Sequence, residues 1–137
     1  PFDKGLSGWS DADALTHAII DALLGAAALG DIGSHFPPGE PQYRDISSLV
    51  LLKKVRDILA ENSSQVVNID ATILAEKPRM ADFILPMRQR LSQALGINTG
   101  QVSIKASTSN GLGFIGSGEG IAAQAIALIE GGKDEGI

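Results

Sequence analysis

The segment from residue 14 to residue 29 most constrains how this chain folds, because it is the most apolar stretch of the sequence. Apolar residues recur there at the spacing of one helical face, which predicts an α-helix: Leu15, Ala18, Ile19, Ala22, Leu23 and Ala26. Polar side chains interrupt the run, so it stays short of the roughly 18 to 20 apolar residues that cross a bilayer. The pattern therefore predicts a helix of a soluble protein, capped by Ser10 or Asp11 and ending near Gly30.

The rest of the chain alternates between helical and strand patterns. In chain order we expect a loop over 31–45, a helix over 46–60, a strand over 66–74, a helix over 80–95, a strand over 102–107, a glycine-rich turn over 110–120 and a short apolar helix over 121–129. Pro86 is expected to end, kink or restart its helix. In the first strand, Val67, Ile69, Ala71 and Ile73 are predicted to share one face.

Length and composition favour one soluble domain over residues 1–137. The formal net charge of −5 would repel nucleic acid and anionic membranes, so we expect neither as a partner. Cysteine is absent, which excludes disulfides and thiolate metal sites and suits a reducing compartment. The chain also opens without the pattern of a secretory signal.

Asp13, His17 and Asp21 follow one another at four-residue intervals and therefore line one stripe of the first helix. An imidazole flanked by carboxylates suits a metal ligand whose second ring nitrogen is held by an acceptor. A solvated helix face is the competing interpretation, and for a single histidine it is the commoner one. One imidazole does not complete a zinc site, which takes about three protein ligands. The other histidine, His35, is expected at the surface.

The glycine-rich turn matches G-x-G-x-x-G over residues 111–116. A dinucleotide fold would also need a following strand that ends in an acidic residue about 20 residues later, and the predicted pattern lacks one. The hydroxyls of Ser107, Thr108 and Ser109 precede the glycines, so the turn suits a phosphate cradle. A tight turn without any ligand fits these residues equally well.

Three blocks of the sequence together carry a resemblance to a known family. They are Ser10 to His17 with Asp21 to Pro37, then Ala75 to Met80, then Lys105 to Thr108 with Gly111 to Phe114. Their order and spacing resemble those of the 2-C-methyl-D-erythritol 2,4-cyclodiphosphate synthases. The resemblance covers almost every residue, so it is far more specific than any single motif.

The family resemblance implies an α+β fold. We expect a two-layer domain in which helices cover one face of a mixed sheet. In the family the sheets pack inward in a homotrimer, and an active site lies in each subunit interface. Members also carry an N-terminal strand with an Asp-x-His pair that supplies two further zinc ligands, and this sequence starts after the point where that strand is expected.

The resemblance also implies a reaction. Family members are phosphorus–oxygen lyases of non-mevalonate isoprenoid biosynthesis, and they convert 4-diphosphocytidyl-2-C-methyl-D-erythritol 2-phosphate to the 2,4-cyclodiphosphate and CMP. The substrate's own 2-phosphate attacks the β-phosphorus, so no protein nucleophile is needed. The implied cofactors are Zn²⁺ and, with the substrate diphosphate, Mg²⁺ or Mn²⁺. The implied location is the bacterial cytoplasm or the plastid stroma.

Matched positions imply the site residues. His17 corresponds to a zinc ligand, while Thr108 and Trp9 take the catalytic positions, with Thr108 stabilising the transition state. The substrate-binding positions are Ser10, Asp31, Ile32, Gly33, Ala75, Pro78, Arg79, Met80, Ala81, Ser107, Thr108, Ser109, Asn110 and Phe114.

Four matched positions depart from the family pattern. Trp9 replaces a histidine, Asn110 a glutamate, Pro38 an aspartate and Ser117 an arginine. An indole can donate a hydrogen bond but does not titrate. These departures support an alternative hypothesis, a non-catalytic trimer that keeps a cytidine-nucleotide pocket beside an incomplete metal site.

Overall fold

The central strand β1 (Ser64–Leu74) organises the structure. The computed structural model describes residues 3–43, 47–74, 81–107 and 122–131, with the backbone alone described over residues 3–12. Ile69, Ala71 and Ile73 of β1 are buried, as the alternation predicts. Val66 is buried in place of Val67, because an irregularity in the pairing between Val66 and Asn68 shifts the alternation there.

The sheet is mixed and has the strand order β2-β1-β3. Strand β2 (Val102–Ser107) runs parallel to β1, with Ile69 opposite Val102 and Leu74 opposite Ser107. Strand β3 (Ala122–Gly131) runs antiparallel to β1, and its first residue, Ala122, also lies opposite Leu74. Leu74, Ser107 and Ala122 therefore meet at one end of the sheet.

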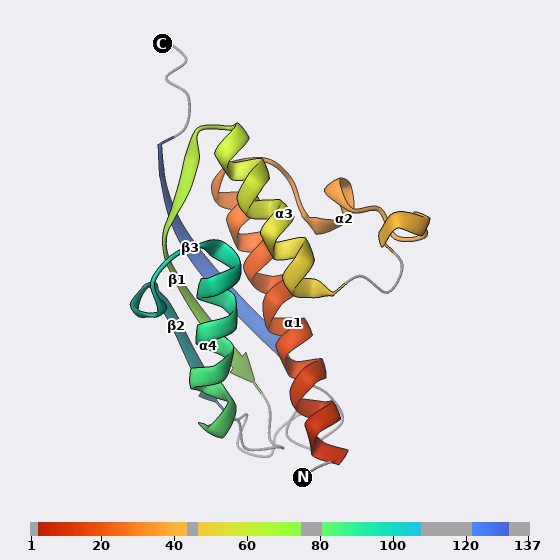
Figure 1. Cartoon of the computed structure of the whole chain (residues 1–137), viewed down its shortest axis with the longest axis vertical. Helices are drawn as coiled ribbons and strands as arrows, with labels where there is room; N and C mark the ends of the chain where they lie inside the picture. Colours follow the sequence, from red (N-terminus) through yellow and green to blue (C-terminus); the bar gives the residue numbers. More distant parts are fainter. Residues whose placement is uncertain (1–2, 44–46, 75–80, 108–121, 132–137) are drawn as a thin grey trace.

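Helices α1 (Asp3–Ala26), α3 (Ser48–Glu61) and α4 (Ala81–Leu95) pack together on one face of this sheet (Figure 1). Each contributes buried apolar side chains at helical spacing to one core, which includes Leu15, Ile19, Leu23, Leu52, Val55, Met87, Leu91, Ile69, Ile73 and Val102. The predicted fold class, a mixed sheet covered by helices on one face, is confirmed. Of the described helices, none combines the length and apolarity needed to cross a bilayer.

Helix α1 ends in a Schellman motif. Leu29 N donates to Leu24 O at 2.8 Å, and Ala28 N donates to Gly25 O at 3.0 Å. Ala28 takes the left-handed position, with a φ of 58°. The predicted end near Gly30 is therefore close to the observed end at Ala26.

The predicted start of α1 is wrong, because the helix begins at Asp3 and contains both Ser10 and Asp11. Serine and aspartate favour N-caps but also occur inside helices, so their presence alone does not locate a helix start.

The segment predicted as a loop, 31–45, contains two short helices among its described residues. These are α2 (Ile32–His35) and a 3₁₀ turn, η1 (Pro41–Tyr43). Helix α3 then begins at Ser48, because the hydroxyl of Ser47 accepts from Leu49 N and caps it. A second 3₁₀ turn, η2 (Thr99–Gln101), connects α4 to β2, and α4 runs through Pro86.

The predicted helix over 121–129 is wrong, because the described residues from Ala122 onward form strand β3. Ala123, Ala125, Ala127 and Ile129 pack against the core on one face of the strand. The other face is also largely apolar, so the two-residue period is hidden in the sequence. The backbone N–H and C=O groups along this edge of β1 need hydrogen-bond partners. Strand β3 provides these partners, so tertiary pairing outweighs the local helical pattern.

Candidate functional site

The polar stripe of α1 lies on the exposed side of the helix. Asp13, His17 and Asp21 are all exposed, while Leu15 and Ile19 between them are buried in the core. The helical period that places apolar side chains on the sheet therefore turns these three outward together. The predicted stripe is confirmed as a feature of the structure.

Both carboxylates of the stripe hold α1 to other segments. Asp13 Oδ1 accepts a hydrogen bond from the hydroxyl of Ser48 at 2.5 Å, at the start of α3. Asp21 Oδ1 accepts from the backbone N–H of Ile32 at 2.8 Å, at the start of α2. The sequence pattern suggested carboxylates that orient His17, whereas the observed bonds give them a role in fixing α3 and α2 beside His17.

Reciprocal hydrogen bonds fix the start of α2. Asp31 has an extended backbone (φ −134°, ψ 178°), and its Oδ1 accepts from Ser34 N at 3.0 Å. The hydroxyl of Ser34 donates to Asp31 O at 2.8 Å. This local pattern explains why a helix of only four residues forms between glycine and proline residues.

The end of α2 is held to the chain before it. His35 Nε2 donates to Leu29 O at 2.6 Å, and His35 is half-buried. The prediction of a surface position for His35 is therefore only partly correct, because this bond draws the ring toward the loop. Phe36 is buried, and its ring meets the edge of Tyr43 with centroids 5.3 Å apart.

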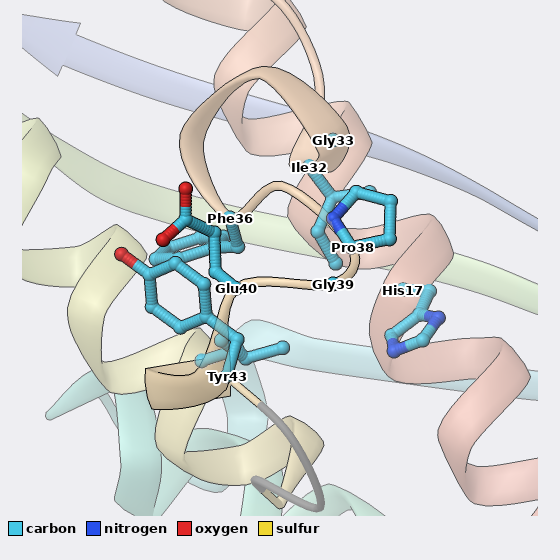
Figure 2. Close-up of a pocket in the computed structure, with 9 residues that line it drawn as sticks. His17, Ile32, Gly33, Phe36, Pro38, Gly39, Glu40 and Tyr43 are labelled. Atoms are coloured by element: carbon cyan, nitrogen blue, oxygen red, sulfur yellow. The ribbon is translucent and has the colours of Figure 1, made fainter.

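A pocket of about 360 Å³ lies between α1 and this loop. Figure 2 shows His17 on one side of it and Tyr43 with Glu40 on the other. Its walls are mainly apolar, and its lining consists of His17, Ile32, Gly33, Phe36, Pro38, Gly39, Glu40, Tyr43 and Leu51. An apolar pocket with a few polar groups at its rim suits a small polar ligand with an aliphatic part.

The structure brings part of the predicted site together here. His17, Ile32 and Gly33 line the pocket, and Asp31 caps the helix that carries two of them. Sequence reasoning did not assign Phe36, Glu40 or Tyr43 to the site. The only available signal was the long loop, since long loops in small domains are often functional.

Other predicted residues lie toward the end of the sheet where Leu74, Ser107 and Ala122 meet. Ser107 ends β2 and Ala81 begins α4. Figure 1 places the start of α1, which carries Trp9 and Ser10, at the same end of the molecule. The remaining predicted positions fall outside the described residues: Ala75, Pro78, Arg79, Met80, Thr108, Ser109, Asn110 and Phe114.

Within residues 13–43, 47–74, 81–107 and 122–131, no three side chains from histidine, aspartate or glutamate gather into a group that could hold a metal ion. His17, the metal ligand predicted from the sequence, lines the pocket, and Glu40 is the other lining residue with a metal-binding side chain. At this pocket the described residues therefore offer one imidazole and one carboxylate, and the rest of any coordination sphere is left to other residues.

Comparisons with known proteins agree with one another. The model of the YgbB family matches residues 1–130. A 2-C-methyl-D-erythritol 2,4-cyclodiphosphate synthase from Dehalococcoides mccartyi (strain CBDB1) is 57% identical over 130 residues, which cover 95% of this chain and 83% of the relative.

Solved structures with the same fold include the bifunctional IspDF from Campylobacter jejuni, with a TM-score of 0.82 and 34% identity over 88% of this chain. This chain spans only 32% of that longer protein. The IspF CDP complex from Plasmodium falciparum has a TM-score of 0.76 and 27% identity, and the match covers 88% of this chain and 72% of the other.

Proposed function

The chain belongs to the YgbB family, and from this we infer that it is a phosphorus–oxygen lyase. It converts 4-diphosphocytidyl-2-C-methyl-D-erythritol 2-phosphate to 2-C-methyl-D-erythritol 2,4-cyclodiphosphate and CMP, a step of isoprenoid biosynthesis. Identity of 57% to a synthase over nearly the whole chain supports this activity over a non-catalytic trimer. The structural observation that supports this function is that His17, Ile32 and Gly33 line one pocket.

In this reaction the protein positions the phosphate groups of the substrate and neutralises their charge. An oxygen of the 2-phosphate forms a bond to the β-phosphorus, the bond from that phosphorus to the bridging oxygen breaks, and CMP leaves with the electron pair. No side chain forms a covalent bond. The protein's contribution is therefore to hold the two phosphates in line and to place donors where charge develops.

The pocket supplies the positioning of the methylerythritol part. Its apolar wall, which includes Ile32 and Phe36, suits the carbon skeleton and excludes water from it. The loop that carries Ile32 and Gly33 is fixed at Asp31 before substrate arrives. Such preorganisation reduces the entropy lost when the reacting groups are aligned.

A nucleotide site is proposed at the end of the sheet, around Ala81 and Ser107. The likeness to a CDP complex supports it, as does the meeting of the strand ends there. Ala81 is exposed at the start of α4, so Ala81→Glu should place a carboxylate beside the nucleotide and weaken CDP binding at least tenfold, because like charges repel.

Titration calorimetry with CDP measures this effect. Ala60→Glu is the matched control, because Ala60 is exposed on α3, a helix that carries none of the proposed nucleotide-binding residues. Equal CDP affinity for the two variants would contradict a nucleotide site at this end of the sheet.

We also propose that His17 is one ligand of a divalent cation, Zn²⁺, and that Mg²⁺ or Mn²⁺ accompanies the substrate diphosphate. Exposure of the imidazole at the pocket rim supports the role of His17. The described residues do not complete the coordination sphere, so further ligands must come from elsewhere. When bound, such an ion would act as a Lewis acid that polarises the phosphates.

Metal analysis of His17→Ala tests this assignment. Full-length protein, with the N-terminal strand of the family included, should copurify with about one zinc per subunit, and His17→Ala should lose the zinc while remaining folded. A chain that begins at Pro1 should bind zinc weakly or not at all, because one imidazole does not replace about three ligands. His35→Gln is the matched control, because the glutamine amide can still donate to Leu29 O. Equal zinc content in the wild type and His17→Ala would return His17 to the solvated-face interpretation.

A homotrimer is proposed from the face of the sheet that the helices leave uncovered. Ile126 is 76% and Leu128 57% exposed on this face of β3. Sheets packed inward around a threefold axis would bury both side chains. In sedimentation velocity at micromolar concentration, the wild type should be a trimer and Ile126→Asp a smaller species.

Val50→Asp is the control for that measurement, because Val50 is also an exposed apolar residue but lies on α3. A wild-type monomer, or dissociation by both variants alike, would contradict the arrangement. The predicted location in the bacterial cytoplasm or plastid stroma is a separate proposal, to be tested by fractionation of the source cells.

A further inference from the structure

Asp21 makes a contact that the reaction chemistry does not require of it. Its carboxylate is exposed on α1, one helical turn after His17. Its Oδ1 accepts a hydrogen bond at 2.8 Å from the backbone N–H of Ile32, a residue of a different element. The N–H groups of a first helical turn lack partners within the helix, so this carboxylate satisfies one that α2 cannot satisfy itself.

The carboxylates of Asp21 and Asp31 hold the start of α2 in two different ways. Asp31 caps α2 from within its own loop, through Ser34 N. Asp21 reaches the same end of α2 from α1, a helix embedded in the core. Asp31 therefore determines the shape of α2, whereas Asp21 determines where α2 lies relative to α1.

That relative position decides the width of the pocket. His17 contributes to the wall from α1, and Ile32 with Gly33 contributes to the wall from α2. The bond from Asp21 joins these two walls directly, through a residue on the same stripe as His17 and the backbone of Ile32. The hydrogen bond from His35 ties α2 only to Leu29, which belongs to the same loop.

We propose that Asp21 is a positioning residue, which sets the spacing between His17 and the Ile32–Gly33 wall through the backbone of Ile32. This inference rests on the proposed function, because it assigns Asp21 to that same pocket. Asp21 acts on the reaction only through the loop. Its loss should therefore lower turnover more than it weakens substrate binding, since misplacement by about 1 Å can cost on the order of a hundredfold in rate.

Two substitutions separate positioning from charge. Asp21→Asn keeps a carbonyl oxygen at the acceptor position and should retain the bond to Ile32. Asp21→Ala removes the acceptor and should lower kcat about ten- to a hundredfold, with a smaller change in KM. Glu61→Ala is the matched control, because Glu61 is an exposed carboxylate at the C-terminal end of α3. The kcat of this variant should equal that of the wild type.

Amide hydrogen exchange provides a readout that does not depend on turnover. Protection of the Ile32 N–H should persist in the wild type and Asp21→Asn and should fall in Asp21→Ala. If the protein had no synthase activity, this exchange pattern would still be expected, so the failure of the proposed function is distinguishable.

Equal kcat for Asp21→Ala and the wild type, in active protein, would overturn the proposal. So would an Asp21→Asn variant as impaired as Asp21→Ala, because the charge would then matter more than the acceptor. Loss of zinc from both Asp21 variants would likewise overturn it by assigning the carboxylate to the metal. Thermal melts of all variants serve as the control that each protein remains folded.

Discussion

Exchanging two residues at the end of α1 should stabilise the protein without changing its composition. Gly25 lies inside the helix, and a Cβ added there would have no atom within 4 Å. Ala28 holds the left-handed position with a φ of 58°. Each residue therefore occupies the conformation that the other prefers.

The magnitude follows from the two positions. Gly25→Ala should add about 0.5–1 kcal/mol, because alanine loses less backbone entropy in a helix. Ala28→Gly should relieve a left-handed cost of about 1–2 kcal/mol, less about 0.4–1 kcal/mol for the freer unfolded glycine. The double exchange should thus gain about 0.5–2.5 kcal/mol, provided that the hydrogen bond from Ala28 N to Gly25 O, 3.0 Å long, is kept.

Urea unfolding of both single variants and the double variant measures these terms. All samples need the same chain concentration, because assembly would contribute to the apparent stability. With an m-value of about 2 kcal/mol/M, the urea midpoint of the double variant should rise by about 0.3–1.3 M. Destabilisation by Gly25→Ala would refute the reasoning and would mean that another molecule packs against this turn of α1.

Three further predictions follow from individual contacts. Lys105 donates to Asp70 Oδ2 at 2.9 Å and so lowers the pKa of that carboxyl below its ordinary value of 3.8. The contribution of this pair is complete above the unfolded pKa and is lost as the pH falls through the lower folded pKa. The difference in urea midpoint between the wild type and Asp70→Asn should therefore begin to shrink near the unfolded pKa and vanish below the folded pKa; a difference that stays constant with pH would contradict this. Ser48→Ala should cost about 0.5–1.5 kcal/mol through the lost bond to Asp13, and a double-mutant cycle that shows simple additivity would exclude that bond. Thr108→Ala should lower kcat about ten- to a thousandfold with little change in KM, and a change confined to KM would instead assign Thr108 to ground-state binding.

Local patterns predicted the elements whose two sides differ in polarity. Strand β2 has the predicted bounds, Val102 to Ser107. Strand β3 could not be predicted, because Ile126 and Leu128 make its outer face largely apolar, like its inner face. The burial of Val66 also escaped prediction, because the irregularity that causes it depends on how β1 pairs with β3.

The candidate site was predictable where a residue's role is visible along the chain. The stripe on α1 follows from helical geometry, and family resemblance added Ile32 and Gly33. The bond from Asp21 to Ile32 was not predictable, because it depends on how the chain returns after the Schellman motif. The meeting of Phe36 and Tyr43 likewise depends on a loop conformation that no sequence period encodes.

The placement of β1 at the centre of the sheet has a consequence for synthesis on the ribosome. Both of its neighbours come later in the chain, and its pairing with β3 joins Ser64 to Gly131. Until β3 has emerged, one edge of β1 exposes unpaired backbone groups beside apolar side chains, which is the kind of surface that other chains can join. Nascent chains stalled before Ala122 should therefore depend on chaperones that shield this edge, and the emergence of β3 from the ribosome should end that dependence.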